Sequence, residues 1–247
     1  MSTYQHDVIV PLKNSADTKK KQVEEMFDKI AFRYDFLNHF LSAGIDVWWR
    51  KQAIRQLVEI KPKIILDVAT GTGDLAILAN KMLKPDKVIG IDISAGMLEI
   101  GRKKLTEAGL QKHIELLKGD SGTIFFDDNT FDAVTVAFGV RNFENLELGL
   151  TEINRVLKPG GKLVILEFTK PGMPLIKGMY NFYLNTVAPR IGSMISRSKN
   201  AYQYLNDSVQ KFPERKTFID ILIKLGYKNT SYKTLTLGIC SIYCAEK

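Results

Sequence analysis

Apolar and polar positions alternate along the chain in blocks that predict strands and helices in turn. The apolar run Ile64–Ala69 is typical of a short buried strand, and it passes through two glycines into a helix-forming run. The same rhythm continues as far as Phe168. We predict strands over Ile64–Ala69, Lys87–Ile93, Ile114–Lys118, Phe131–Phe138 and Lys162–Phe168, and helices over Asp74–Leu83, Ser94–Ala108 and Leu146–Leu157. This alternation indicates a parallel α/β sheet covered by helices on both faces.

The C-terminal part of the chain follows a different pattern. A helix over Pro213–Leu225 precedes two predicted strands, Tyr227–Leu235 and Ile239–Ala245, which are joined through Leu237 and Gly238. Such a tight connection predicts an antiparallel hairpin, which a dinucleotide dehydrogenase would not need.

The N-terminal part predicts an arm and a cap. Residues 1–22 lack periodicity and are expected to form a mobile arm, while helices over Val23–Phe36 and Trp48–Ile60 form a cap at residues 23–60. The aromatic stretch Tyr34–Trp49 fits a cover over an apolar ligand, although core packing would explain most of it. The main domain then runs from 61 to 247, with a helical insertion at about 171–212 that we expect to help cover the substrate.

The glycine turn after the first predicted strand is a candidate ligand site. Gly71 and Gly73 let the backbone approach a ligand closely, and the following helix start directs free N–H groups towards it. The spacing to Ala76 also satisfies the looser dinucleotide fingerprint, so the turn alone does not identify the cofactor.

Three acids at or near the carboxyl ends of predicted strands sharpen this interpretation. Asp67 precedes the glycine turn, Asp92 ends the second apolar run, and Asp120 ends the third. Open α/β sheets bind ligands at this edge, and an acid after the second strand suits a ribose diol. The pattern resembles that of S-adenosylmethionine-dependent methyltransferases, with Asp67 near the amino-acid end of the cofactor and Asp120 near the adenine. The alternative is that Asp74 or Asp120 only caps a helix.

Composition narrows the classes of protein. The chain has 247 residues, enough for one large α/β domain, and no apolar run reaches the ~20 residues that a membrane span needs. Without a secretory signal in residues 1–22, we expect a cytoplasmic protein. Cys240 and Cys244 would lie about 13 Å apart in a strand, too far for a disulfide. With the three histidines scattered, no metal site is expected.

The net charge of +8 suggests an anionic partner. Nucleic acid, an anionic membrane surface and ordinary solvated faces all fit this charge. No basic run is interleaved with aromatic residues, so we do not expect nucleic acid binding.

Three stretches carry a resemblance to a known family. They are Tyr34-Asp35-x-x-Asn38-x-x-Leu41-Ser42-x-Gly44-x-x-x-x-Trp49, Phe138-Gly139-Val140-Arg141-Asn142, and Arg155-Val156-Leu157-Lys158-Pro159-Gly160-Gly161-x-Leu163-x-Ile165-Leu166-Glu167-Phe168-Thr169-x-Pro171. From about Val23 to the C-terminus, the chain resembles the ubiquinone/menaquinone biosynthesis C-methyltransferase family. The mild departures are Leu37, Asp46 and Thr169, which stand where methionine, histidine and serine are usual. Only Asp46 alters the chemistry, because it weakens any role for a histidine there.

The resemblance implies a fold, a reaction and a set of contacts. The fold would be that of class I S-adenosylmethionine-dependent methyltransferases, a Rossmann-like, seven-stranded mixed sheet with the last strand antiparallel. The reaction would be transfer of a methyl group from S-adenosylmethionine to a ring carbon of demethylmenaquinol, leaving S-adenosylhomocysteine. Thr72, Asp92, Asp120 and Ser121 match cofactor-contacting positions, and Ala137 stands where serine is usual, so only its backbone could serve. Together with Asp67, Gly71 and Gly73, these are the expected cofactor residues.

Methylation of a quinol carbon also needs a base and a group that stabilises an oxyanion. Arg141 and Asn142 directly follow the fourth predicted strand, so Arg141 could stabilise the quinolate and Asn142 could orient a hydroxyl or a water. Asp120 is the nearest candidate carboxylate, and Tyr34 is a candidate lid residue or phenolic donor. The alternatives are a structural salt bridge for Arg141 and core packing for Tyr34.

Other functions stay open at this point. The substrate's polyprenyl tail lies in the membrane, so the aromatic and basic segment 171–212 could touch the inner membrane surface, or could instead form a homodimer contact. The chain could also be an O- or N-methyltransferase of another small molecule, a nucleic-acid methyltransferase, or a non-catalytic binding protein. The preference between naphthoquinol and benzoquinol substrates is open as well.

Overall fold

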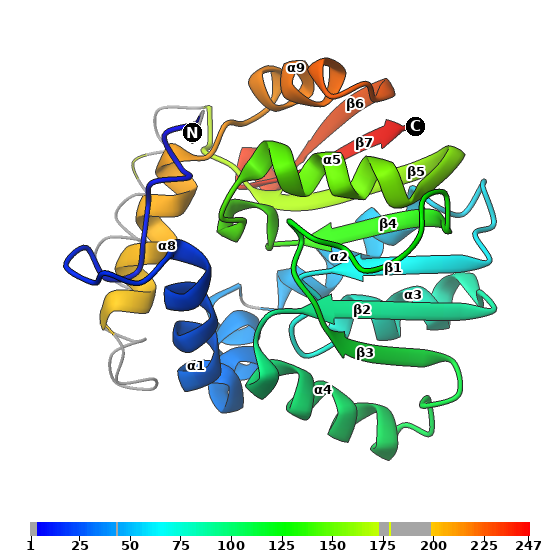
Figure 1. Ribbon diagram of the computed structural model, residues 1–247, viewed down its shortest axis with the longest axis horizontal. Coiled ribbons are helices and arrows are strands. Elements are labelled where there is room, and N and C mark those ends of the chain that lie inside the picture. The colour runs from blue at the N-terminus through cyan, green and yellow to red at the C-terminus, as the bar shows by residue number, and fades with distance from the viewer. Residues whose placement is uncertain (1–3, 43, 173–177, 179–198) are drawn as a thin grey trace.

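The structure is a computed structural model, and it describes residues 4–42, 44–172, 178 and 199–247. Its centre is a seven-stranded sheet in the order β3-β2-β1-β4-β5-β7-β6 (Figure 1). The strands are β1 (Ile64–Val68), β2 (Lys87–Asp92), β3 (Ile114–Lys118), β4 (Phe131–Ala137), β5 (Leu157–Phe168), β6 (Lys228–Leu235) and β7 (Cys240–Glu246). Strands β1 to β5 pair in parallel, whereas β7 runs antiparallel to both β5 and β6. The predicted mixed sheet with an antiparallel last strand is confirmed.

Helices cover both faces of this sheet, and each face has its own core. The helices α5 (Leu146–Val156) and α9 (Lys216–Lys224) contribute Leu150 and Phe218 to one buried cluster. On the other face lie α2 (Ile45–Arg55), α3 (Asp74–Leu83) and α4 (Ala95–Glu107), whose apolar side chains form the second cluster. Burial on both faces explains the nearly continuous apolar runs of β1 and β4.

Most strand boundaries agree with the prediction, whereas α2 begins and ends earlier than the predicted helix Trp48–Ile60, and two other differences have local causes. β5 begins at Leu157 because this residue pairs with Phe131 across a register shift, so residues 158–161, between the predicted helix and the predicted strand, fall within β5. The helix α9 begins at Lys216, because Arg215 has a non-helical φ of 55° and donates its N–H to the Tyr243 hydroxyl at 2.8 Å.

The predicted N-terminal cap is divided, because its first helix lies beyond the carboxyl ends of the parallel strands whereas α2 packs on a face of the sheet. Its first helix, α1 (Lys19–Leu41), is longer than predicted at both ends, and the left-handed Gly44 (φ 76°) leads into α2. In Figure 1, α1 and α8 (Lys199–Lys211) lie on the side of the sheet to which the arrowheads of β2, β3 and β4 point. This placement puts α1 at the edge where ligands bind in such sheets.

The described part of the predicted arm packs against the body of the protein. His6 and Asp7 are buried, and the Tyr4 hydroxyl donates to Glu147 of α5 at 2.7 Å. Whether this segment moves stays a prediction.

The structure also bears on the predicted insertion, the two cysteines and membrane-spanning helices. Much of the predicted insertion at 171–212 lies outside the described residues, but α8 within it is helical. Cys240 and Cys244 are free and buried on β7. Among the described helices, none is both long and apolar enough to cross a membrane.

Candidate active site

A cavity opens at the carboxyl edge of the sheet, and α1 forms one of its walls. Its lining comes from the segments that follow β1, β2, β3 and β4, together with Lys20, Val23 and Phe27 of α1. The fold brings most of the predicted site residues to this cavity, namely Tyr34, Gly71, Asp92, Asp120, Ser121, Ala137 and Asn142. The other four, Asp67, Thr72, Gly73 and Arg141, are not in its lining.

Asp92 lies on the cavity wall at the end of β2. Its Oδ2 accepts the N–H of Gly71 at 2.8 Å, and its Oδ1 accepts the N–H of Ser94 at 2.8 Å. Burial of the carboxyl group raises its pKa to about 6, and the nearby Asp28 carboxylate adds to the effect. Each carboxylate oxygen has a second lone pair, so Asp92 can still accept hydroxyl groups of a ligand.

Asp67 supports the glycine turn from the protein interior through Thr70, which directly precedes Gly71. It is buried, and it accepts hydrogen bonds from Thr135 on the neighbouring strand β4 at 2.7 Å and from Thr70 at 2.6 Å. Burial raises the pKa of its carboxyl group to about 6. With both oxygens engaged beneath the turn, Asp67 orders the loop and does not form the cavity surface.

The glycine turn itself depends on left-handed backbone positions. Gly71 and Gly73 have φ values of 57° and 81°, which residues with a Cβ rarely adopt. Gly73 begins α3 as its N-cap and faces the Leu116 side chain, where a Cβ would approach to 3.3 Å. These two glycines therefore shape the loop, and Gly71 alone also lines the cavity.

At the end of β3, Asp120 meets the first turn of α1. The Lys20 ammonium forms an ion pair with its Oδ2 at 2.7 Å, and the N–H of Gly122 donates to its Oδ1 at 3.0 Å. Lys20 was not foreseen from the sequence, because Lys19-Lys20-Lys21 looks like an ordinary solvated helix start. The pair connects the cap to the adenine side of the predicted cofactor site.

Arg141 lies beside the cavity in a buried ion pair. Its Nη1 contacts Glu167 at 2.6 Å and also donates to the Phe138 carbonyl at 2.6 Å, and its guanidinium lies 5.4 Å from the centre of the Phe168 ring. Burial disfavours the charged guanidinium, but the Glu167 carboxylate outweighs this and keeps the pKa of Arg141 above its usual value. Glu167 is fully buried, so it needs this cation in turn. This contact is the salt bridge that the sequence left as an alternative.

Around Arg141, buried polar atoms lack protein partners. Arg141 Nε, Asn142 Oδ1 and the hydroxyl of Tyr204 on α8 have no hydrogen-bond partner among the described residues. Of these residues, only Asn142 lines the cavity. Because unpaired buried polar groups are costly, such atoms are typical of places that receive a ligand or water.

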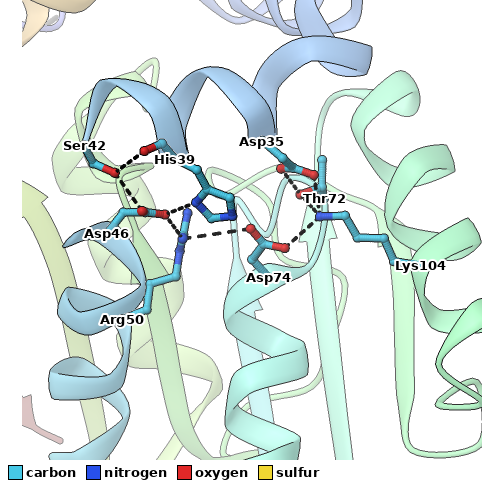
Figure 2. A network of polar contacts seen from close by, with 8 residues as sticks. All are labelled: Asp35, His39, Ser42, Asp46, Arg50, Thr72, Asp74 and Lys104. Carbon is cyan, nitrogen blue, oxygen red and sulfur yellow. Dashed lines mark hydrogen bonds and ion pairs between the residues drawn. The ribbon is translucent and has the colours of Figure 1, made fainter. Parts of the chain in front are cut away.

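Thr72 is not in the cavity lining, and its side chain lies in a network of charged side chains that Figure 2 shows. Its hydroxyl donates to Asp35 of α1 at 2.6 Å and accepts from Lys104 of α4 at 2.9 Å. A second part of the network joins His39, Ser42, Asp46, Arg50 and Asp74. Asp46 thus anchors the start of α2 to the end of α1.

The sheet order and the cavity at its carboxyl edge define the fold of S-adenosylmethionine-dependent methyltransferases. A solved methyltransferase of this kind from Thermotoga maritima matches with a TM-score of 0.65 at 18% identity, covering 91% of this chain and 99% of that one. The [4+2]-cyclase SpnF matches with a TM-score of 0.62 at 18% identity over 94% and 97%. Because a cyclase shares it, this fold does not by itself define a reaction.

Sequence relatives narrow the class to one family. Residues 15–247 match the ubiE/COQ5 methyltransferase family, and this chain belongs to it. A demethylmenaquinone methyltransferase from Bacteroides fragilis is 46% identical over 99% of both chains. A ubiquinone/menaquinone biosynthesis C-methyltransferase from Geotalea daltonii is 44% identical over 93% of this chain and 97% of its own length.

Proposed function

We propose that this protein transfers the methyl group of S-adenosylmethionine to a ring carbon of demethylmenaquinol, producing menaquinol. The observation that carries the proposal is the 46% identity, over 99% of both chains, to a relative named demethylmenaquinone methyltransferase. Family membership over residues 15–247 supports the same reaction type.

The residues at the cavity are suited to hold the cofactor. Asp92 would accept the ribose hydroxyls, and its two N–H donors keep the carboxylate oriented towards the cavity. Asp120 and Ser121 would contact the adenine, with Lys20 competing for the Asp120 carboxylate. Gly71 and the backbone of Ala137 would border the methionine part, with Asp67 and Thr72 supporting the loop from outside the cavity.

The residues around Asn142 are suited to the acceptor ring. When bound, S-adenosylmethionine supplies an electrophilic methyl group on a sulfonium ion. Asn142 Oδ1, which has no partner among the described residues, would hold a water against a ring hydroxyl, and Tyr34 would close over the ring from α1. The buried Arg141, which is next to Asn142 in the sequence and outside the cavity lining, would stabilise negative charge on the ring oxygen.

In this arrangement the protein acts chiefly by positioning. Orienting two reactants for an in-line displacement can contribute on the order of 7–11 kcal/mol to catalysis. Asp120 is engaged by Lys20 and so is a weaker candidate base than the sequence suggested. We therefore propose that a water held by Asn142 Oδ1 takes up the ring hydroxyl proton and passes it to bulk water.

Turnover of radiolabelled S-adenosylmethionine with reduced demethylmenaquinone tests the proposal, with a benzoquinol analogue in parallel. Label in the naphthoquinol ring is the expected result. Without label in either quinol, despite cofactor binding, the function would shift to methylation of another small molecule at oxygen or nitrogen.

We further propose that the protein works in the cytoplasm at the inner face of the membrane, where its substrate's polyprenyl tail lies. The net charge of +8 would favour an anionic surface. Co-sedimentation with anionic vesicles is expected, and it should weaken in high salt. No sedimentation, together with a dimeric mass in solution, would instead favour the homodimer contact.

A further inference from the structure

The Lys104 side chain of α4 is bonded to three different parts of the chain. Its ammonium lies 2.5 Å from Asp35 Oδ2 in α1, 2.7 Å from Asp74 Oδ1 at the start of α3, and 2.9 Å from Thr72 Oγ1 in the glycine turn (Figure 2). A lysine ammonium has three N–H donors, so all of them are used. The Thr72 hydroxyl closes the arrangement by donating to the other Asp35 oxygen at 2.6 Å.

Each partner of Lys104 is adjacent to a residue of the cavity or of the glycine turn. Asp35 directly follows Tyr34, and Thr72 directly follows Gly71; both Tyr34 and Gly71 line the cavity. Asp74 directly follows Gly73, which caps α3. Lys104 itself is not in the lining. Lys104 therefore contacts two segments, α1 and the glycine turn, at residues next to those that line the predicted cofactor site.

The charges explain why a cation is needed at this point. Asp35 and Asp74 bring two carboxylates to the same ammonium. Without that charge the carboxylates would repel each other, and α1 would be pushed away from the glycine turn. Arg50 lies 3.9 Å from Asp74 and is already committed to Asp46, so it cannot replace Lys104.

The neighbouring Lys103 provides a contrast on the same helix. Among the described residues its ammonium pairs with Glu99 alone, four residues earlier, at 2.9 Å, and both side chains are exposed. The side chains of Lys104, Asp35 and Asp74 are each about one-quarter exposed. Partly exposed pairs add little to overall stability, so the effect of Lys104 should be on local geometry.

We propose that Lys104 is a positioning residue, which holds α1 against the glycine turn and thereby places Tyr34 and Gly71 at the cofactor cavity. It touches neither cofactor nor acceptor and acts through Asp35 and Thr72. The inference relies on the proposed function only for the identity of the cofactor.

Binding of S-adenosylhomocysteine, measured by calorimetry, tests the proposal without any methyl acceptor. Lys104→Met removes the charge but keeps most of the side chain, and it should weaken binding on the order of tenfold. Lys104→Arg keeps the charge and should recover part of the affinity. Lys103→Met is the matched control and should bind like the wild type. Hydrogen exchange of the α1 amides should rise in Lys104→Met and not in Lys103→Met.

A double-mutant cycle tests whether Lys104 acts through Asp35, and thermal unfolding of each variant is the control for folding. Asp35→Asn should weaken binding, and the variant with both Asp35→Asn and Lys104→Met should bind no more weakly than Lys104→Met alone. Additive losses, or equal affinity of Lys104→Met and Lys103→Met, would overturn the proposal. If S-adenosylhomocysteine binds the wild type but no quinol is methylated, the proposed function fails while this test still stands.

Discussion

The two sides of the cavity are built in opposite ways. On the glycine-turn side, Asp92 receives backbone N–H groups from Gly71 and Ser94, and the carboxyl ends of neighbouring parallel strands bring these groups together. On the other side, Arg141 depends on Glu167, which lies 26 residues later on β5. The first side is organised by backbone geometry, whereas the second depends on a buried pair of opposite charges. We therefore expect substitutions on the first side to leave the fold intact, and substitutions on the second side to lower the free energy of unfolding.

Removing Glu167 should produce the largest loss in the free energy of unfolding. Glu167→Ala leaves the buried Arg141 charge without its partner, which typically costs about 3–5 kcal/mol in the free energy of unfolding. Urea unfolding would measure this loss. Glu167→Gln, which keeps a hydrogen-bond acceptor, should lose less. Equal stability of Glu167→Ala and the wild type would contradict the charged-pair interpretation.

Removing Asp92 should affect ligand affinity more than stability. Asp92→Ala loses hydrogen bonds from a carboxylate to two ribose hydroxyls, so S-adenosylhomocysteine should bind about 100-fold more weakly. Calorimetry measures the affinity, and thermal unfolding serves as the control. Exposed Asp127→Ala, in the loop before β4, should change neither value.

The pH dependence of binding should report the raised pKa of Asp92. With a pKa of about 6, the carboxyl group is ionised at pH 7 and protonated at pH 5. Protonation removes acceptor capacity, so the affinity for S-adenosylhomocysteine should fall as the pH decreases through 6, by about tenfold at most by pH 5. In Asp92→Asn, this dependence should largely disappear. A rise in wild-type affinity at low pH would contradict the role of the ionised Asp92 carboxylate in binding.

The stability of the fold should depend on pH with the opposite sign, through Asp92 and also through Asp67. The pKa of Asp67 and of Asp92 is raised from 3.8 to about 6 on folding, so the folded state binds more protons than the unfolded state between these values. Their contribution to the free energy of unfolding therefore increases as the pH falls from about 6 to 4. Comparing wild type with Asp67→Asn by urea unfolding at pH 7 and 5 isolates the Asp67 part of this contribution, which is absent from the variant.

The smallest effect concerns the start of α4 beside Asp92. The Ser94 hydroxyl accepts the N–H of Met97 at 3.1 Å and donates to Asp28 of α1 at 2.6 Å. Ser94→Ala should cost about 1 kcal/mol of stability. Asn145→Ala, which removes the comparable N-cap hydrogen bond of α5, should cost a similar amount of stability without affecting a contact to α1. A difference in ligand affinity between the two variants would measure what the Asp28 contact adds.

Local chemistry allowed much of this protein to be predicted from its sequence. The period of the apolar positions predicted the α/β sheet, and the Leu237-Gly238 connection predicted the antiparallel β7. The positions of Gly71, Asp92 and Asp120 after successive strands predicted that they would meet, because parallel strands end at one edge. These features depend on residues close in sequence or on a general rule of topology.

Only the tertiary structure decided how distant side chains pair. Arg141 and Thr72 were expected at the cavity, yet Glu167 engages the first, while Asp35 and Lys104 engage the second. Lys104 looks like Lys103 in the sequence, and only packing of α1 against α4 distinguishes them. Sequence periodicity indicates which face of a helix is buried, but it does not indicate which charged groups from other elements that face will meet.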